Sequence, residues 1–264
     1  ACSVGACHPG TAPGNIRIRR AAGPGCGYLC GLQQAPPTMN DELTRVRVWD
    51  LPTRLFHWLL AASVLASIAS AYVGGNAMVW HFRLGYLAFT LLAFRIVWGL
   101  VGGRWSRFAN FIHAPSTVLR YLRGQHRPGE HLDVGHNPLG ALSVFALLAL
   151  LAAQVGTGLF ADDEIANTGP LIKYVSGSTS LALTHWHKVY GQWAIIALVL
   201  LHVAAIVYHR VRKRHDLLRP MIHGDKLLAR DVPASIDSVR TRLLALILIG
   251  LCGGLVGWIV AQGG

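Results

Sequence analysis

Five long apolar runs constrain the fold of this chain more than any other feature of its sequence. They cover Leu55–Gly74, Val79–Gly102, Pro138–Phe160, Val189–Tyr208 and Leu243–Ala261. The length of each run is close to that of a membrane-spanning α-helix, which needs about 20 residues to cross roughly 30 Å of hydrocarbon. Open sheet edges are excluded from a bilayer, because no water is present to satisfy their unpaired backbone groups. The runs therefore predict an all-α integral membrane protein, a helical bundle with five transmembrane helices.

The distribution of basic residues predicts how the bundle is oriented. The net charge of +12 raises the question of nucleic-acid binding, but the basic residues gather between the apolar runs. Lys and Arg number three in Met39–Arg54, five in Arg104–Asn137 and nine in Arg210–Arg242, whereas Ala161–Trp186 has only Lys173. The short cytoplasmic connections of membrane proteins carry such an excess. We therefore predict no nucleic-acid partner, a bacterial inner membrane location in contact with lipid, a cytoplasmic N-terminus and a periplasmic C-terminus.

The first 38 residues differ in composition from the apolar body of the chain. They are rich in Gly, Pro, Ala and Arg, and they hold four of the five cysteines: Cys2, Cys7, Cys26 and Cys30. Four residues separate Cys2 from Cys7-His8, whereas a c-type haem attachment site has two, so we expect no c-type haem there. We predict that residues 1–38 are a disordered leader, or an extension outside the native protein with Met39 as its natural start.

Four histidines in or beside the apolar runs are the strongest functional signal. His57 lies near the start of the first run and His81 near the start of the second, and the fourth run has His187 at one end and His202 toward the other. His187 and His202 are fifteen residues apart, which in an α-helix is about 22 Å of height and only about 60° of rotation. Both can therefore face one bundle interior at different depths.

These depths predict two levels with two histidines each. His57 pairs with His202 near the cytoplasmic side, and His81 pairs with His187 near the outer side. Two neutral imidazoles are what the iron of a haem with two axial histidines requires, and helical bundles build such sites from facing helices. The sequence therefore predicts two b-type haems whose iron atoms are bound by these four histidines.

Other assignments of the histidines stay open, because a single histidine in a helix is more often a hydrogen-bonding core residue than a ligand. His185 is an alternative to His187, although it lies about 100° round the helix from His202. The remaining histidines fall in polar connections, where we expect them to be solvated: His113, His126, His131, His136, His209, His215 and His223.

A porphyrin also needs room beside its axial ligand. Gly85 follows His81 by four residues, and Gly191 follows His187 by four residues. Each histidine therefore has a glycine one turn away on its own face of the helix, where a porphyrin plane can approach.

Three arginines lie in or beside the spans, where an unpaired charge is expensive: Arg54, Arg83 and Arg95. Haem propionates would neutralise them. For Arg54 and Arg83 the alternative is that the long side chains reach the lipid head groups. Arg95 lies deeper in its span and is harder to explain in that way.

Several motifs together resemble the prokaryotic cytochrome b561 family, which includes the b-type cytochrome subunit of nickel–iron hydrogenases. The resemblance covers residues 46–226 and rests on Arg54-Leu-Phe-His57-Trp58, His81-Phe-Arg-Leu-Gly85, Arg95-Ile-Val-Trp-Gly99, Gly135-His-Asn-Pro-Leu-Gly140, His187 with His202, and Leu218-Arg-Pro-Met-Ile-His-Gly-Asp-Lys226. It implies a four-helix dihaem core with ligands from the first, second and fourth helices, here His57, His81, His187 and His202. It also implies electron transfer between a membrane quinone pool and a redox partner protein, such as a c-type cytochrome or a hydrogenase-like subunit, as in respiratory electron transport.

The resemblance also divides the chain. Residues 39–226 are expected to form the dihaem membrane domain, and residues 227–264 a cytoplasmic linker followed by an extra transmembrane helix. That helix is rich in glycine, which suits close helix contact. A second departure is the spacing of His187 and His202, which is one residue longer than the resemblance leads us to expect.

The residues favour an electron-transfer subunit over a free-standing enzyme, since haem supplies the redox chemistry and the protein supplies ligands and a low dielectric. One alternative is a self-sufficient membrane oxidoreductase, similar to superoxide oxidases, that couples a small substrate on the outer side to quinone. It would need a basic funnel on that side, where Arg83, Lys173 and Lys188 are the only cations. A further alternative is a transporter or assembly protein without haem.

Overall fold

The computed structural model describes residues 43–125, 132–228 and 232–263, which fall within one compact unit, Asp41–Gly264. The predicted leader, residues 1–38, lies outside the described residues, as do His126 and His131.

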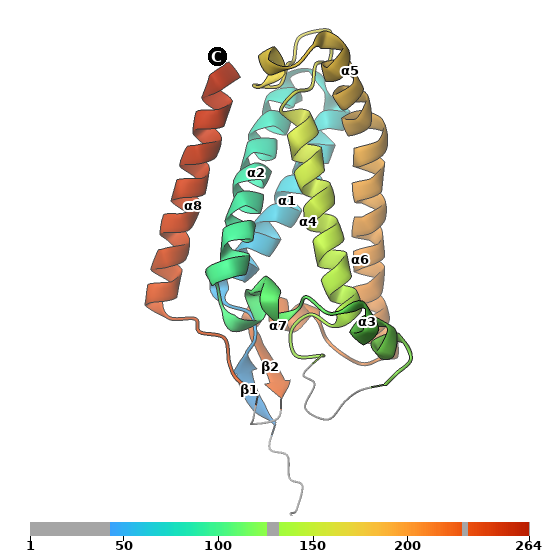
Figure 1. Cartoon of the computed structure of the whole chain (residues 1–264), viewed down its shortest axis with the longest axis vertical. Helices are drawn as coiled ribbons and strands as arrows, with labels where there is room; N and C mark the ends of the chain where they lie inside the picture. Colours follow the sequence, from blue (N-terminus) through green and yellow to red (C-terminus); the bar gives the residue numbers. More distant parts are fainter. Residues whose placement is uncertain (1–42, 126–131, 229–231, 264) are drawn as a thin grey trace, which may run out of the picture. The chain divides into compact units, whose positions relative to one another are not determined.

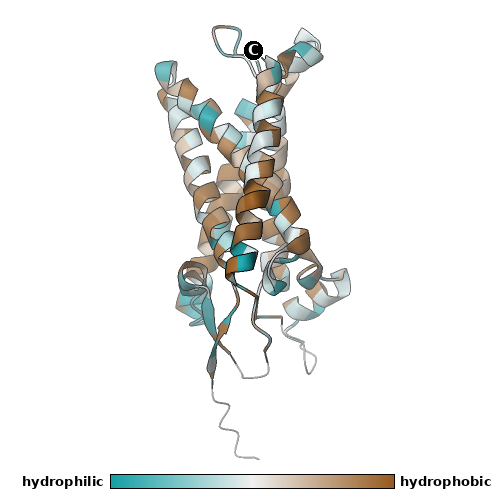
Figure 2. Cartoon of the chain, turned by 90° about the vertical axis from the view of Figure 1, so that its left-hand side faces the viewer, coloured by the Kyte–Doolittle hydropathy of each residue, from teal (hydrophilic) through white to brown (hydrophobic). Residues whose placement is uncertain are grey.

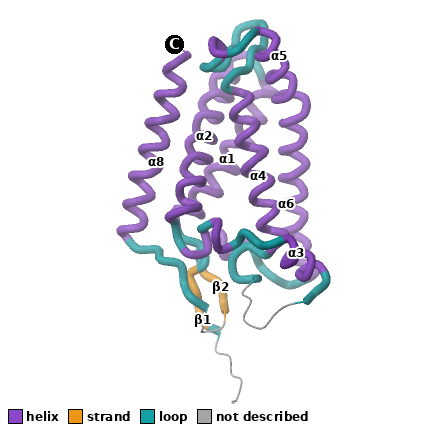
Figure 3. Tube along the Cα trace, viewed as in Figure 1, coloured by secondary structure: helices purple, strands orange, loops and turns teal. Residues whose placement is uncertain are grey.

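Five long helices dominate the described part of the chain (Figures 1 and 3). They are α1 (Leu51–Val73), α2 (Met78–Val101), α4 (Pro138–Gly158), α6 (Gln192–Arg212) and α8 (Val239–Val260). All five are long and apolar enough to cross a membrane, α6 together with the helical turns before it. Figure 2 shows hydrophobic colour along the helices and hydrophilic colour gathered near the strands. The predicted all-α membrane bundle with a fifth C-terminal helix is confirmed.

The long helices begin and end where the sequence supplies caps. The Asp50 carboxylate accepts a hydrogen bond from the Thr53 backbone N–H at 2.8 Å, and the Asn137 side chain accepts one from Gly140 at 2.7 Å. A proline follows each cap within the first helical turn, where its missing N–H costs nothing. Helix α1 stops at Gly74, whose φ of +67° is left-handed backbone that glycine adopts without a steric penalty.

Helix α2 is at the centre of the packing. It contacts α1, α4 and α8, and α4 in turn contacts α6. Fully buried Asp50 ties the start of α1 to the end of α2, since it accepts hydrogen bonds from Trp98 Nε1 at 3.2 Å and Ser106 Oγ at 2.6 Å. The apolar core of the bundle includes Phe56, Leu60, Leu91, Leu92, Phe94, Trp98, Leu151 and Ile195.

Short helices connect the long ones. The connections contain η1 (Gly75–Ala77), η2 (Arg104–Ser106), η3 (Phe108–Asn110), α3 (Pro115–Leu122), η4 (Ile172–Tyr174), α5 (Gly177–His185) and α7 (Leu218–His223), and η6 (Ala261–Gly263) follows α8. Helix α5 runs directly into a π-helical turn, Trp186–Gly191, and then into α6. The fourth span therefore begins before the predicted Val189, and helix occupies much of Leu171–Leu183.

A small antiparallel sheet was not expected from the sequence. Strand β1 (Thr44–Arg47) pairs with β2 (Asp225–Leu228), with Thr44 opposite Leu228 and Arg47 opposite Asp225. Four residues are too few for a clear alternation of apolar and polar side chains, so the pattern gave no signal. The sheet joins the segment before α1 to the segment after α7.

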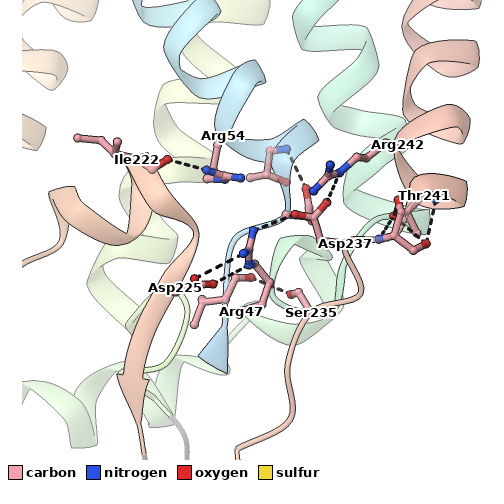
Figure 4. Close-up of polar contacts among 12 residues, drawn as sticks. Arg47, Arg54, Ile222, Asp225, Ser235, Asp237, Thr241 and Arg242 are labelled. Carbon is pink, nitrogen blue, oxygen red and sulfur yellow. Dashed lines mark hydrogen bonds and ion pairs between the residues drawn. The ribbon is translucent and has the colours of Figure 1, made fainter. Parts of the chain in front are cut away.

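Arg47 connects this sheet to the start of α8 (Figure 4). Its guanidinium contacts Asp225 at 2.6 Å and Asp237 at 3.0 Å, and Arg242 contacts Asp237 at 2.9 Å. Burial alone would raise the pKa of the Asp237 carboxyl, but the hydrogen bond and charge of Arg242, then the backbone N–H of Leu51 and the charge of Arg47, outweigh it and hold that pKa below its usual value. One carboxylate thus joins β1 to the first turn of α8.

Candidate functional site

The four predicted histidines lie in two facing pairs. The first, here called the sheet-side pair because it lies toward the β1–β2 end of the bundle, is His57 on α1 and His202 on α6, with ring centroids 6.5 Å apart and planes at 48°. The second, the α5-side pair, is His81 on α2 and His187 in the π-turn, with centroids 6.0 Å apart and planes at 83°. The structure brings together the pairs that helix arithmetic predicts.

Both spacings fit a metal ion held between two imidazoles. An ion midway would lie about 3 Å from each centroid, which is what a bond of about 2 Å to a ring nitrogen gives once the half-width of the ring is added. Within the described residues, no three His, Cys, Asp or Glu side chains converge on a point where they alone could hold a metal. Each pair therefore suits an ion whose remaining ligands come from a macrocycle, as in haem.

Hydrogen bonds fix the protonation of the α5-side pair. His81 Nδ1 lies 3.0 Å from the Ser67 carbonyl oxygen, and His187 Nδ1 lies 2.9 Å from the Gln154 carbonyl oxygen. A carbonyl oxygen only accepts, so Nδ1 must carry the hydrogen in both rings. The lone pair of each neutral imidazole is then on Nε2, the atom left free to bind a metal.

Hydroxyl groups add a second acceptor to each of these rings. The Ser67 Oγ lies 3.1 Å from His81 Nδ1, and the Thr157 Oγ1 lies 3.2 Å from His187 Nδ1. The Gln154 side chain also donates a hydrogen bond from Nε2 to the His187 carbonyl oxygen at 3.0 Å. Gln154 therefore holds both the imidazole ring and the backbone carbonyl of His187, a role that the sequence did not indicate.

The sheet-side pair lacks this arrangement. His57 Nδ1 is buried and has no hydrogen-bond partner among the described residues. Its Nδ1 atom therefore has none of the orienting acceptors that both rings of the α5-side pair possess.

The π-turn explains the long spacing between His187 and His202. A π-turn holds one residue more than the corresponding α-helical turn, and such turns are often found at functional sites. The turn Trp186–Gly191 contains His187 and leads directly into α6, so it accommodates the extra residue in the spacing to His202. His185 is exposed and packs on Tyr190 with ring centroids 5.4 Å apart, so it is His187 that faces His81.

The two glycines predicted to make room for a porphyrin differ. A Cβ placed on Gly85 would meet nothing within 4 Å, as predicted. A Cβ placed on Gly191 would collide with the side chains of Gln154 and Trp186, so that space is filled by protein and is not the open face we predicted. A third glycine, Gly158, lies directly against His187, because a Cβ placed on it would lie 3.0 Å from the His187 Cε1 atom.

The three predicted arginines lie in different surroundings. Arg95 is 3% exposed, its guanidinium lies 4.6 Å from the Phe108 ring centroid, and its Nη1 has no hydrogen-bond partner within the part of the chain that the structure describes. Arg54 donates to the Ile222 carbonyl oxygen at 2.6 Å (Figure 4), and its buried Nε is unpaired among the residues in the described ranges. Arg83 is exposed over Trp80. Arg95 and Arg54 thus have donors to spare for an anionic group.

Three of the remaining histidines are not freely solvated, contrary to the expectation from the sequence. The centroid of the His136 ring lies 4.5 Å from that of Phe111 and 4.7 Å from that of Trp49, and its buried Nδ1 has no partner among residues 43–125, 132–228 and 232–263. Burial, followed by the charge of Arg95, lowers the pKa of His136 to about 3. Buried nitrogens without partners are also found on His113 and His209. The position of His136 directly before the Asn137 cap of α4 was the available signal for its burial.

Comparison with known proteins gives one family. The model of prokaryotic cytochrome b561 matches residues 48–224. A probable Ni/Fe-hydrogenase B-type cytochrome subunit of Azotobacter vinelandii is 26% identical over 228 residues, covering 72% of this chain and 92% of the relative. The probable Ni/Fe-hydrogenase 1 B-type cytochrome subunit of Escherichia coli (strain K12) is 24% identical over 219 residues, which cover 70% of this chain and 92% of the relative. No solved structure matches significantly.

Proposed function

This chain belongs to the prokaryotic cytochrome b561 family, and on that premise we propose that it is the dihaem membrane cytochrome through which a nickel–iron hydrogenase exchanges electrons with the quinone pool. Membership makes it a haem-binding electron-transport protein of a bacterial membrane. The hydrogenase partner is proposed because the similar proteins are probable subunits of that enzyme, and the match covers nearly their whole length.

The arrangement of the histidines in two pairs carries the proposal of two b-type haems. His57 and His202 would hold one haem, and His81 and His187 the other. Each pair has the ring spacing that a shared metal ion needs, and the α5-side pair also has the required tautomer. Arg95 and Arg54 have donors that could bind the propionates of the sheet-side haem, while Arg83 and Gly85, on the same helix as His81, would lie beside the α5-side haem.

The protein's own contribution is to hold the two centres apart in a dry interior. Haem, when bound, supplies a one-electron couple. Fifteen residues of helix separate His187 from His202, which sets the two levels about 20 Å apart along the bundle. The apolar core keeps water away from the space between them. Such a chain conducts electrons between the two membrane surfaces and leaves bond-making chemistry to its partner, so we propose an electron-transfer subunit.

The test is haem content in single histidine variants of the full chain. His57→Ala and His202→Ala should each lose the same haem, and His81→Ala and His187→Ala the other, so every variant keeps about one haem per chain. His185→Ala is the matched control and should keep two. The ratio of haem to protein and the reduced optical spectrum give the result. Retention of both haems in all four variants would show the pairing to be wrong.

A further inference from the structure

One motif of the sequence has no part in either histidine pair. Residues 218–226 form α7 and the start of β2. Helix α7 is held against the first turns of α1, where Arg54 donates to the Ile222 carbonyl oxygen at 2.6 Å (Figure 4). Trp58, one turn further along α1, donates from Nε1 to the Met221 carbonyl oxygen at 3.3 Å. Exposed tryptophan on a membrane-spanning helix favours the level of the lipid head groups, so the motif lies at the membrane surface.

A groove with a volume of about 1010 Å³ lies beside this motif. Its lining comes mainly from β1, α7, β2 and the connection between α6 and α7. Small-molecule sites in proteins enclose about 300 to 1,000 Å³, so the groove is large enough for an organic ligand. Four cationic side chains line it: Arg45, Arg214, Arg219 and Lys226.

The three carboxylates of the groove do not neutralise these cations, because each has another partner. Asp225 pairs with Arg47 at 2.6 Å. Asp216 accepts hydrogen bonds from two backbone N–H groups of α7 at 3.0 and 3.1 Å. Asp133 accepts one from the Tyr121 hydroxyl at 3.3 Å. The three arginines of the groove are exposed and make no side-chain hydrogen bond or ion pair within the described part of the chain, so their donors are available to an anion.

Arg214 has a backbone conformation that arginine rarely adopts. Its φ of +54° lies in the left-handed region, where a side chain brings a steric penalty that glycine avoids. Residues strained in this way are found preferentially at functional sites. An arginine at this position therefore places a cation in the groove at a local cost in stability.

An apolar surface leads from the groove along α6. Val203, Val207 and Val211 are exposed at four-residue spacing, so they follow one face of the helix toward the connection that contains Arg214. A soluble phosphate would use none of this surface. A phospholipid would place its phosphate in the groove and its acyl chains against these valines.

We propose that the groove binds the head group of an acidic phospholipid, with Arg45, Arg214 and Arg219 contacting its phosphate. Basic pockets at the ends of membrane-spanning helices are suited to such head groups, because each nearby Lys or Arg adds to the attraction. The bound lipid joins β1 to α7 and so stabilises the sheet-side end of the bundle. The inference requires no haem and does not depend on the proposed electron transfer.

The experiment is thermal unfolding of the purified full chain in neutral detergent, titrated with phosphatidylglycerol. A ligand that binds only the folded state raises the midpoint temperature, and the dependence on concentration gives the affinity. We expect a rise with phosphatidylglycerol and none with phosphatidylcholine, which has no net charge. An equal rise with inorganic phosphate would identify a soluble anion as the ligand and overturn the lipid assignment. No rise with phosphatidylglycerol, or an equal rise with phosphatidylcholine, would overturn the site.

A triple substitution tests the contacts in the groove. Replacing its three arginines together by Gln should weaken phosphatidylglycerol binding at least about tenfold. The matched control removes the same charge from three exposed arginines that do not line the groove and belong to connections or a helix start at the same end of the bundle: Arg107→Gln, Arg123→Gln and Arg240→Gln. The control should leave the affinity unchanged. Equal weakening in the two triple variants would mean that only the overall charge attracts the lipid, and would overturn the site.

Arg214→Gly separates a ligand contact from a structural role. Glycine adopts a positive φ without a penalty, and this relief offsets the greater freedom of the unfolded chain. The variant should therefore unfold at about the same temperature as the unaltered chain when lipid is absent. It should nevertheless gain less from phosphatidylglycerol. An undiminished gain would contradict the contact assigned to Arg214.

Discussion

The absence of a side chain at Gly158 leaves room for the imidazole ring of His187. A methyl group there would lie 3.0 Å from Cε1 of His187, closer than an ordinary van der Waals contact. Gly158→Ala should therefore displace the imidazole and weaken haem binding at the α5-side pair by about 1 to 3 kcal/mol, the usual cost of overpacking. The haem-to-protein ratio and the electron paramagnetic resonance signal of the low-spin iron would report it.

Gly156→Ala is the control for this substitution, because a Cβ at Gly156 meets nothing within 4 Å. It adds the same methyl group to the same helix and should leave both haems in place. Equal loss of haem in the two variants would mean that α4 is sensitive to any added side chain, and that contact with His187 is not the cause.

The four histidines could be predicted from the sequence because helix geometry fixes the depth and direction of each one within its own span. Gln154 and Gly158 could not. They lie on α4, which carries none of the four, and they reach His187 only because α4 packs against the π-turn. Arg95 was predicted as a propionate partner, but its contact with Phe108 depends on a connection that has no regular period.

At the scale of helices, the π-turn makes a specific prediction about chain length. Deleting Val189 should convert Trp186–Gly191 to ordinary α-helix and leave His187 fourteen residues from His202. In an α-helix this spacing places the two side chains about 40° apart around the helix axis, in the direction opposite to the about 60° of a fifteen-residue spacing. Both rings would still face the interior, so this variant should keep two haems. Haem content and the optical spectrum are the measurements.

Inserting one alanine after Val189 is the matched change in the opposite direction. The π-turn already holds one extra residue, so a second would rotate His187 by about 100° away from His81. The expected result is one remaining haem. Loss of haem on deletion together with its retention on insertion would show that the π-turn does not align the two histidines.

The junction between β1 and α8 depends on Asp237. Asp237→Asn removes the negative charge that Arg47 and Arg242 share, and should lower the stability of the detergent-solubilised protein by about 1 to 2 kcal/mol, because the carboxylate is 5% exposed but the arginines are partly solvated. Thermal unfolding is the measurement. Asp225→Asn, which leaves the contact to α8 intact, should cost less.

This contribution also has a defined pH dependence. The folded pKa of Asp237 lies below its unfolded value, so the carboxylate stabilises the fold at neutral pH. The stabilisation is complete above the unfolded pKa of about 4 and is lost as the pH falls through the folded pKa. The difference in stability between the unaltered chain and Asp237→Asn should therefore shrink only below about pH 4. A difference that is constant down to pH 2 would exclude the charge as its cause.

For the whole molecule, the distribution of basic residues predicts which side each connection faces. The segment from Arg210 to Arg242 has nine Lys and Arg residues, and Ala161–Trp186 has one. By the positive-inside rule we predict that the β1–β2 end is cytoplasmic and that the C-terminus is periplasmic. A C-terminal alkaline phosphatase fusion should be active and a fluorescent protein fusion dark. The reverse pattern would invert the orientation or remove α8 as a span.

The number of spans could be predicted from the sequence because the length and apolar character of each run are local properties. The pairing of β1 with β2 could not, since it joins segments about 180 residues apart by a register of only four residues. The sheet agrees with the span count all the same. Two strands can pair only on one side of a membrane, so an even number of crossings must separate them, and α1, α2, α4 and α6 provide four.

This pairing has a consequence for the order of events during synthesis. A chain is made from its N-terminal end, so β1 leaves the ribosome before any of the long helices, while β2 follows α6. The edge of β1 has no partner until four helices have been delivered to the bilayer. Closure of the sheet then marks the moment at which all four histidines of the two pairs have left the ribosome, before α8 has emerged. Haem capture can therefore be complete while the last helix is still inside the ribosome.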